Sequence, residues 1–251
     1  MPQRRWRQSH DYTGLLIATL VICSWGLHLV WVLHLNFSAI PPISIIGTVL
    51  AQAFLNTGLF VTAHDAIHGL VCRHRIINGG VGAFCSAAYA ALSYKTLRRS
   101  HWLHHRDPMG SFDPDFCDIP DADFWTCYQQ FMAQYLGPKQ LLTLAAAVLA
   151  VSLIGQVSPL NVVLFWGLPL LLSSIQLFYV GTYSPHQQAA SRNMQHCCAP
   201  SPALPWLGSF LLCYHFSYHQ EHHDYPSVPW WQLPTVYRQH LDTQNARGYH
   251  Q

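Results

Sequence analysis

Eight histidines of the chain fall into three short clusters. They are His64 and His68, then His101, His104 and His105, and finally His219, His222 and His223. A spacing of three or four residues places side chains on one face of a helical turn. Neutral imidazole is a common nitrogen ligand for iron, copper and zinc. Three such clusters in one chain indicate a metal site.

The number of histidines favours two metal ions. A single zinc ion is usually satisfied by four ligands. Nitrogen-rich ligation with open positions favours iron, and less often copper. His186 is a candidate ninth ligand, whereas His215, one turn before His219, is expected to support a ligand. For His64 and His68 taken alone, interfacial histidines that reach toward headgroups remain the alternative.

Carboxylates lie within or just after the three clusters. Asp65 is inside the first, and Glu221, the only glutamate in the chain, is inside the third. Asp115 follows the second cluster, together with Asp107 and Asp113. A carboxylate that accepts the second ring N–H of a ligating histidine fixes its tautomer. We therefore take Asp65, Asp115 and Glu221 as candidate catalytic carboxylates.

Other charged or ionisable residues are expected to lie outside the site. We interpret three aspartates as solvated loop charges: Asp118, Asp121 and Asp123. His28 and His34 lie too far along the first apolar stretch to reach the clusters. The remaining histidines are expected at the surface: His10, His74, His196, His240 and His250.

The composition is that of an integral membrane protein. Only 10% of residues are charged, against about 25% in an average soluble domain. Residues 12–63 and 140–191 contain no Asp, Glu, Lys or Arg. Each block is long enough for two crossings of about 20 residues. The net charge of only +2 does not indicate a nucleic-acid partner.

Turn signals divide each uncharged block in two. The sequence predicts an all-α, single-domain chain (residues 1–251) with four transmembrane helices, arranged as two hairpins. Their approximate ranges are 13–35, 43–63, 140–156 and 160–182. Residues 76–94, rich in Gly and Ala, are expected to form a re-entrant or interfacial segment, and residues 203–214 a shorter interfacial stretch.

The basic residues predict the orientation. With the N-terminus in the cytoplasm and residues 76–94 not spanning, all 13 Lys and Arg residues fall on or near the cytoplasmic side, as the positive-inside rule requires. The same arrangement puts the three histidine clusters on that side. If residues 76–94 spanned the bilayer, the first two clusters could not share a site.

Cysteine usage adds little. The eight cysteines contain no C-x2-C pair and no regular framework. Cys23 and Cys85 lie in apolar runs, and we expect both to be small core residues. The apolar run after the N-terminal arginines is too long for a cleavable signal peptide, so we interpret it as the first membrane helix.

The runs around the clusters resemble a known family. Residues 57–69 (TGLFVTAHDAIHG) and 101–105 (HWLHH), followed by DPD at 113–115, are similar to the first two histidine boxes of bacterial and cyanobacterial β-carotene ketolases. Residues 176–186 and 213–226 (CYHFSYHQEHHDYP) are similar to the rest. The match runs from about residue 45 to about 235. The bare boxes are specific for the membrane-bound di-iron desaturase and hydroxylase superfamily, and the longer runs for the ketolases. Ile67 stands where methionine is common.

The resemblance implies a function. It implies two iron ions as cofactor, O2 as co-substrate, and oxidation of the C4 methylene of carotenoid β-ionone rings, from β-carotene to echinenone or canthaxanthin. A carotenoid partitions into membrane lipid, which suits a site at the membrane edge. Electrons would come from an external donor such as ferredoxin, since the chain has no nucleotide loop, haem motif or iron–sulfur motif.

Three alternatives remain open from the sequence. Two belong to the same superfamily, a fatty-acyl desaturase and a carotenoid ring hydroxylase. The third is a non-catalytic membrane metal-binding protein or transporter. A transporter is expected to carry ionisable residues near the middle of its spans. The uncharged blocks hold no such charges, which favours the enzyme.

Overall fold

A computed structural model describes residues 11–36, 40–119, 122–191 and 200–248, and the described residues form helices and connecting segments without strands. The helices before the second uncharged block are α2 (Asp11–Leu33), α3 (Pro42–Ile67), α4 (Arg75–Ala90), α5 (Tyr94–Arg106) and α6 (Phe124–Tyr135). They are followed by α7 (Pro138–Ile154), α8 (Pro159–Val162), α9 (Leu168–Phe178) and α10 (Ser184–Ser191). The last part comprises α11 (Trp206–Cys213), α12 (His219–Asp224), a short 3₁₀ turn η4 (Trp230–Gln232) and α13 (Leu233–Gly248). The all-α prediction is confirmed for the described residues.

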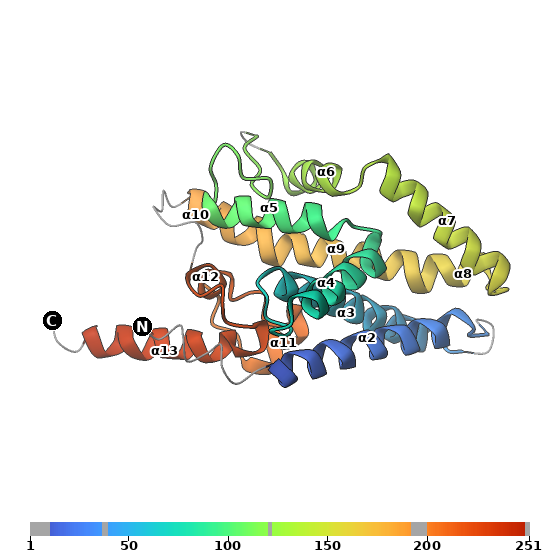
Figure 1. The fold of residues 1–251 in the computed structure, drawn as a ribbon, viewed down its shortest axis with the longest axis horizontal. Helices are drawn as coiled ribbons and strands as arrows, with labels where there is room; N and C mark the ends of the chain where they lie inside the picture. The colour runs from blue at the N-terminus through green and yellow to red at the C-terminus, as the bar shows by residue number, and fades with distance from the viewer. Residues whose placement is uncertain (1–10, 37–39, 120–121, 192–199, 249–251) are drawn as a thin grey trace.

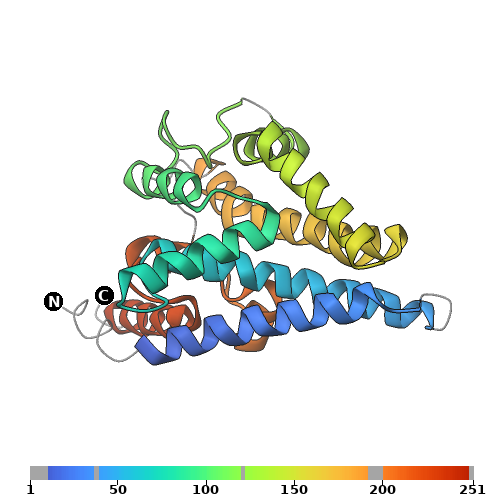
Figure 2. The same ribbon diagram turned by 45° about the vertical axis from the view of Figure 1, so that its right-hand side comes forward.

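Three helices are long and apolar enough to cross a membrane. They are residues Tyr12–Leu33, Pro42–Ile67 and Pro159–Gln187. The third is continuous through α8, α9 and α10, joined by two π-helical turns, η2 (Val163–Gly167) and η3 (Tyr179–Tyr183). α3 packs against both α2 and α9, and all three helices run in a similar direction in Figures 1 and 2. The expected helices at 13–35, 43–63 and 160–182 are therefore present.

The fourth expected helix, residues 140–156, is present as α7, but it is not a candidate span by itself. α7 has 17 residues and is joined to α6 at a bend of 83°. α4 and α5 form a similar pair with a bend of 100°. By length and composition the chain thus has three candidate spans, or up to five if each bent pair counts as one. The segment expected to be re-entrant or interfacial, residues 76–94, is mostly the helix α4.

Local signals explain where the helices that carry the histidines begin and end. Gly69 adopts a φ of +74° after α3, and Gly69 and Leu70 donate backbone N–H groups to Ala66 and Asp65. This is the left-handed helix end for which glycine is suited. Ser93 caps α5 by accepting the N–H of Thr96. The turn between α4 and α5 brings α5 back against the end of α3.

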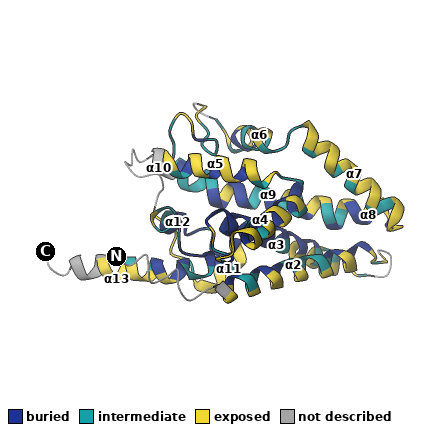
Figure 3. Ribbon diagram, in the orientation of Figure 1, coloured by how far each residue is buried: buried dark blue, intermediate teal, exposed yellow. Residues whose placement is uncertain are grey.

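Many residues on the outer faces of the helices are exposed (Figure 3), and large apolar side chains are common among them. Leu27 on α2, Ile43 on α3 and Ile154 on α7 are each more than 70% exposed. An apolar outer surface suits lipid as the surrounding solvent. The chain is a membrane protein.

The cysteines differ in part from expectation. Cys85 is buried as predicted, but Cys23 is exposed, because it lies on the outward face of α2. Cys117 and Cys127 form a disulfide, with their Cα atoms 5.4 Å apart. The pair joins the loop after α5 to α6. Spacing alone gave no signal for it, because the loop folds back on itself.

Candidate metal centre

Nine histidines from α3, α5, α10 and α12 meet at one place in the fold. Eight of them form two groups of four, and within each group the nitrogens lie within 4.8 Å of one another. The first group is His64, His68, His101 and His222. The second group is His104, His186, His219 and His223.

The first group joins the end of α3 to α5 and α12. The Nε2 atoms of His68 and His101 are 2.8 Å apart. The ring of His64 lies 4.4 Å from that of His101 and 4.5 Å from that of His222, centroid to centroid. Both ring nitrogens of His64 are buried without a hydrogen-bond partner. Buried polar atoms without partners are costly, and a metal ion would satisfy them.

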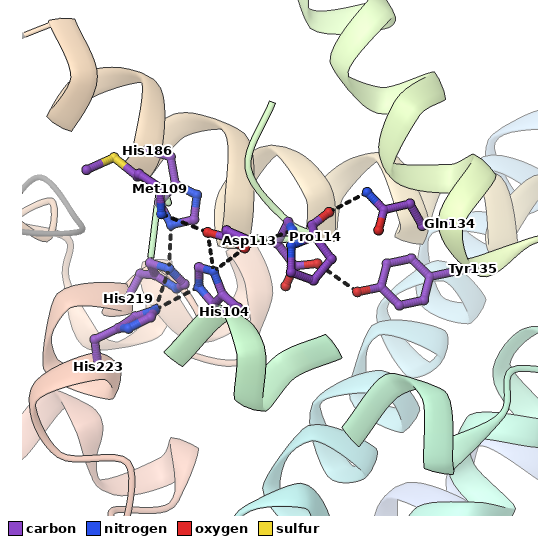
Figure 4. Close-up of polar contacts among 10 residues, drawn as sticks. His104, Met109, Asp113, Pro114, Gln134, Tyr135, His186, His219 and His223 are labelled. Carbon is purple, nitrogen blue, oxygen red and sulfur yellow. Dashed lines mark hydrogen bonds and ion pairs between the residues drawn. The ribbon is translucent and has the colours of Figure 1, made fainter. Parts of the chain in front are cut away.

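The second group joins α5, α10 and α12 (Figure 4). The Nε2 atom of His223 lies 2.9 Å from that of His104 and 3.1 Å from that of His219. His186 completes the group, with its Nε2 atom 3.3 Å from that of His219. The sequence places His186 just after the long apolar helix, but in the structure it lies within the last turns of that helix, Pro159–Gln187, and among the clustered histidines.

His105 lies between the two groups. Its Nε2 atom is 2.9 Å from the Nε2 atom of His222 in the first group. Its ring stacks on that of His223 in the second group, at a centroid distance of 4.3 Å. The helical spacing of the second cluster produces this split, because His101, His104 and His105 point to neighbouring but distinct directions.

The environment keeps the imidazoles of α12 neutral. Burial, together with the repulsion of the neighbouring histidines, holds the pKa of His219, His222 and His223 well below the ordinary value. A neutral imidazole has a free lone pair with which to bind a metal ion. The donor set of this site thus fits metal ions with a preference for nitrogen.

Asp113 holds His104 in place. Both carboxylate oxygens lie close to Nδ1 of His104, at 2.9 and 3.0 Å, and the same carboxylate accepts backbone N–H groups from Met109 and Asp115. Burial would raise the pKa of Asp113, but the hydrogen bond and electrostatic attraction of His104 and the two N–H groups hold it below its ordinary value. An ionised carboxylate only accepts, so Nδ1 of His104 carries the proton and Nε2 is left to face the group.

The sequence placed Asp115, rather than Asp113, in this role. In the structure the Asp115 carboxylate accepts a hydrogen bond of 2.7 Å from the Tyr135 hydroxyl (Figure 4). Burial raises the pKa of Asp115, against the opposing effects of His104 and Tyr135. The sequence does not reveal how the loop after α5 turns, so it gives no ground for choosing Asp113 over Asp115.

Asp65 and Glu221 contact other groups more closely than they contact the clustered histidines. Asp65 accepts the backbone N–H of Trp230 at 3.3 Å, and its carboxylate is 3.9 Å from Nδ1 of His64. Glu221 accepts a hydrogen bond of 2.5 Å from Ser201. Its other oxygen lies 3.7 Å from Nδ1 of His240. The contacts of Glu221 therefore tie α12 to the preceding loop and to α13.

Among the remaining histidines, His74 lies at the surface as expected, whereas His240 and His215 make contacts that differ from the predictions. His240 is not a free surface residue, because it also contacts the Tyr225 hydroxyl at 3.2 Å. His215 is fully buried, with Nδ1 bonded to Ser209 at 2.6 Å and its ring against Trp230. This contact stabilises the loop before α12 instead of bonding a clustered histidine. His74 is exposed as expected, while His10, His196 and His250 lie outside the described residues.

An apolar cavity of about 240 Å³ leads to the histidines. His64, His101, His104 and His219 line one end, next to Asp115. The other end reaches Leu144 of α7 and the exposed residues Gly167 and Leu171. The wall between them is formed largely by aromatic and aliphatic side chains, among them Phe60, Tyr89, Phe131, Leu170 and Phe178. The cavity therefore joins the outer, lipid-compatible surface to the candidate metal centre.

The π-helical turn η3 lies where the long third helix reaches this cavity. Gly181 and Thr182 of η3 line the cavity, and a side chain at Gly181 would collide with the ring of Phe216. π-turns within long helices occur frequently at functional sites. His186 lies three residues beyond the end of this turn.

Comparisons with known proteins agree with this geometry. The family model described as "Fatty acid desaturase" matches residues 38–143 and 128–251. A "Beta-carotene ketolase" of a Paracoccus species is 36% identical, with 89% of this chain and 92% of the relative covered. A "Zeaxanthin 4-ketolase" of Chlamydomonas reinhardtii is 35% identical over 89% of this chain and 53% of the relative. A "Beta-carotene ketolase" of Haematococcus lacustris is 40% identical over 72% and 58%. No solved structure matches the chain.

A chain with this helical membrane fold, paired histidine groups and family match belongs to the fatty acid desaturase family. Within that family the three relatives named above are carotenoid ketolases, as the resemblance predicted. The chain spans little more than half the length of several algal relatives that it matches. It covers nearly all of the bacterial one.

Proposed function

We propose that the protein oxidises the C4 methylene of carotenoid β-ionone rings to a ketone, with O2 as co-substrate. The observation that carries this proposal is the apolar cavity that ends on four of the clustered histidines. A cavity of 240 Å³ is smaller than the usual site for a drug-sized ligand. It suits the ring end of a long polyene, whose remaining length would extend past Leu144 and Leu171 into lipid. The ketolase relatives support the same substrate class.

The nine histidines would hold two iron ions, one near each group. When bound, the iron pair supplies the activation of O2 and the removal of hydrogen from carbon, which side chains alone do not perform. The chain's own residues contribute the ligands and their orientation. Asp113 would keep the proton of His104 on Nδ1, so that Nε2 stays available.

The protein also controls the approach of the ring. The aromatic and aliphatic wall would exclude water and align the ring edge with His64, His101 and His104. Asp115 and Tyr135 are the polar pair nearest to that end of the cavity. Because burial raises the pKa of Asp115, this carboxyl group is suited to hold or pass a proton beside the reacting carbon. We propose that role for Asp115, and positioning roles for Asp65 and Glu221.

The reaction also constrains the partners. Oxidation of a methylene to an alcohol by O2 releases water and requires a pair of electrons from outside the chain. A second such oxidation gives a geminal diol that loses water to form the ketone. A separate electron carrier, such as ferredoxin, would supply both pairs. Membrane lipid would store and deliver the carotenoid.

We further propose a multi-pass topology with the candidate metal centre on the cytoplasmic side. The three candidate spans Tyr12–Leu33, Pro42–Ile67 and Pro159–Gln187 would be three crossings, and α7 would provide the fourth. In this arrangement α4 and α5 return to the same side instead of crossing. The cations of α5 support this, because charged side chains are costly in hydrocarbon.

Expression in a bacterium that accumulates β-carotene tests the proposal. Chromatography and mass spectrometry of the pigments should show products that carry one oxygen more and two hydrogens fewer per oxidised ring. Unchanged β-carotene, with the protein inserted and loaded with iron, would reject C4 oxidation. A product with an extra double bond, or with a hydroxyl group alone, would instead assign a desaturase or a ring hydroxylase.

A further inference from the structure

The two faces of helix α5 differ sharply in chemistry. The inner face carries Leu97, His101 and His104, all buried. The outer face carries Lys95, Arg98, Arg99, Trp102 and Arg106, all exposed. At 3.6 residues per turn these five side chains lie within a sector of about 100°. One helix thus joins a basic surface directly to the candidate metal centre.

Trp102 connects the surface to the histidines. Its side chain is 44% exposed and is surrounded along the helix by the four cations. On its other side the indole ring contacts the rings of His68 and His105, at centroid distances of 5.2 and 5.9 Å. His105 and His223 are also the least buried of the nine histidines. A path of aromatic contacts therefore runs from this face through Trp102 to His68 of the first group and to His105, which lies between the two groups.

We propose that the outer face of α5 is the docking surface for a small acidic protein that delivers electrons to the metal centre. The proposal rests on the oxidation proposed above, since that reaction requires electrons from outside the chain. Four cations on one face complement an acidic partner and accelerate its association. Trp102 supplies the exposed aromatic anchor that is typical of binding hot spots. Its contacts with His68 and His105 give electrons a direct route inward.

The experiment uses the full-length protein in nanodiscs of zwitterionic lipid, with a plant-type [2Fe–2S] ferredoxin as the probe. The association rate constant of ferredoxin is measured by biolayer interferometry, without carotenoid. In Arg98→Glu/Arg99→Glu we expect it to fall by about tenfold or more at low ionic strength. The wild-type rate should fall steeply as salt is added. The control Lys139→Glu/Arg238→Glu, which reverses two exposed cations on α7 and α13, should stay within about twofold of wild type, because it changes the net charge equally but not this face.

If the double Glu variant fails to insert, Arg98→Gln/Arg99→Gln and the salt dependence of the wild type give the same test. Equal losses in the α5 and control variants would reduce the effect to net charge and overturn the proposal. Unchanged ferredoxin association, with loss only of copurified anionic lipid, would assign the face to headgroups and also overturn it. Ferredoxin binding that depends on α5, in a protein that forms no ketone, would instead reject the proposed oxidation and leave the docking surface standing.

Discussion

At the scale of single residues, the candidate metal centre depends on the histidines and on the groups that hold their rings, as Asp113 holds His104. The spacing within each cluster is local, so that a helical turn is enough to align His64 with His68 or His101 with His104. Whether Asp113 or Asp115 would bond His104 depends on the loop after α5, which carries no periodic signal. The same holds for His240, whose contact with Glu221 requires α13 to lie beside α12.

Asp113→Asn tests the support of His104. The amide removes the negative charge and one of the acceptors that hold the proton on Nδ1. We expect a loss of about 10–100-fold in activity or metal affinity. Ketone formed per unit of inserted protein, together with iron content, measures the effect. Asp118→Asn is the matched control, since Asp118 is exposed on the same loop, and equal losses in the two variants would refute the role of Asp113.

His186→Ala tests the ninth histidine. We expect it to behave like Ala variants of the eight histidines in the clusters, with ketone formation nearly abolished and iron content reduced, because the second group would keep three of its four members. His34→Ala is the control. His34 is exposed, and its ring bonds only the local carbonyl of Val30 among the contacts described for it. Full activity in His186→Ala would remove it from the metal centre.

At the scale of elements, the long helices of the two uncharged blocks follow from the sequence, but the bends between helices do not. α3 is followed by Gly69, whose φ of +74° is a left-handed conformation for which glycine is suited. The bend of 83° between α6 and α7 depends on how α6 packs across α9, where Phe131 meets Phe178. That contact joins segments far apart in the sequence. The sequence therefore predicts the helix at residues 140–156 but not the bent pair that it forms with α6.

Leu170→Trp tests the cavity formed by these elements. Leu170 lines the cavity on α9, so a larger ring there would block the approach of the substrate. Overpacking costs about 1–3 kcal/mol, and we expect kcat/KM for β-carotene to fall by about tenfold or more while iron content is retained. Leu168→Trp places the same ring on the outward side of the helix, away from the cavity lining. Similar losses in both variants would mean that the cavity is not the substrate site.

At the scale of the whole molecule, charge distribution and ligand geometry agree. The sequence required all three clusters on one side of the membrane, and the fold brings nine histidines together at one end of the long helices. What the sequence could not supply was the division into two groups. That division depends on the end of α3 and on α10, each of which contributes to one group only, whereas α5 and α12 contribute to both, and it is a property of the complete fold.

Cysteine-labelling reporters after Gly69 and after Pro108 test the topology. We expect both positions to react from the cytoplasmic side, because α4 and α5 would return without crossing. The Cys117–Cys127 disulfide lies shortly after Pro108 in the chain, and disulfides are rare in the cytosol. The labelling therefore decides on which side of the membrane this loop lies. Labels on opposite sides would mean that the bent pair crosses, which would contradict a shared site.

The most direct test of the central claim is the metal content of the purified protein. After anaerobic reconstitution with ferrous iron and removal of unbound metal, elemental analysis per mole of chain should give about two iron ions, because the nine clustered histidines exceed the needs of one ion. We expect one ion in each of the two groups, since the four histidine nitrogens of a group lie within 4.8 Å of one another. A single tightly bound zinc ion, or a protein that retains no iron, would contradict the account.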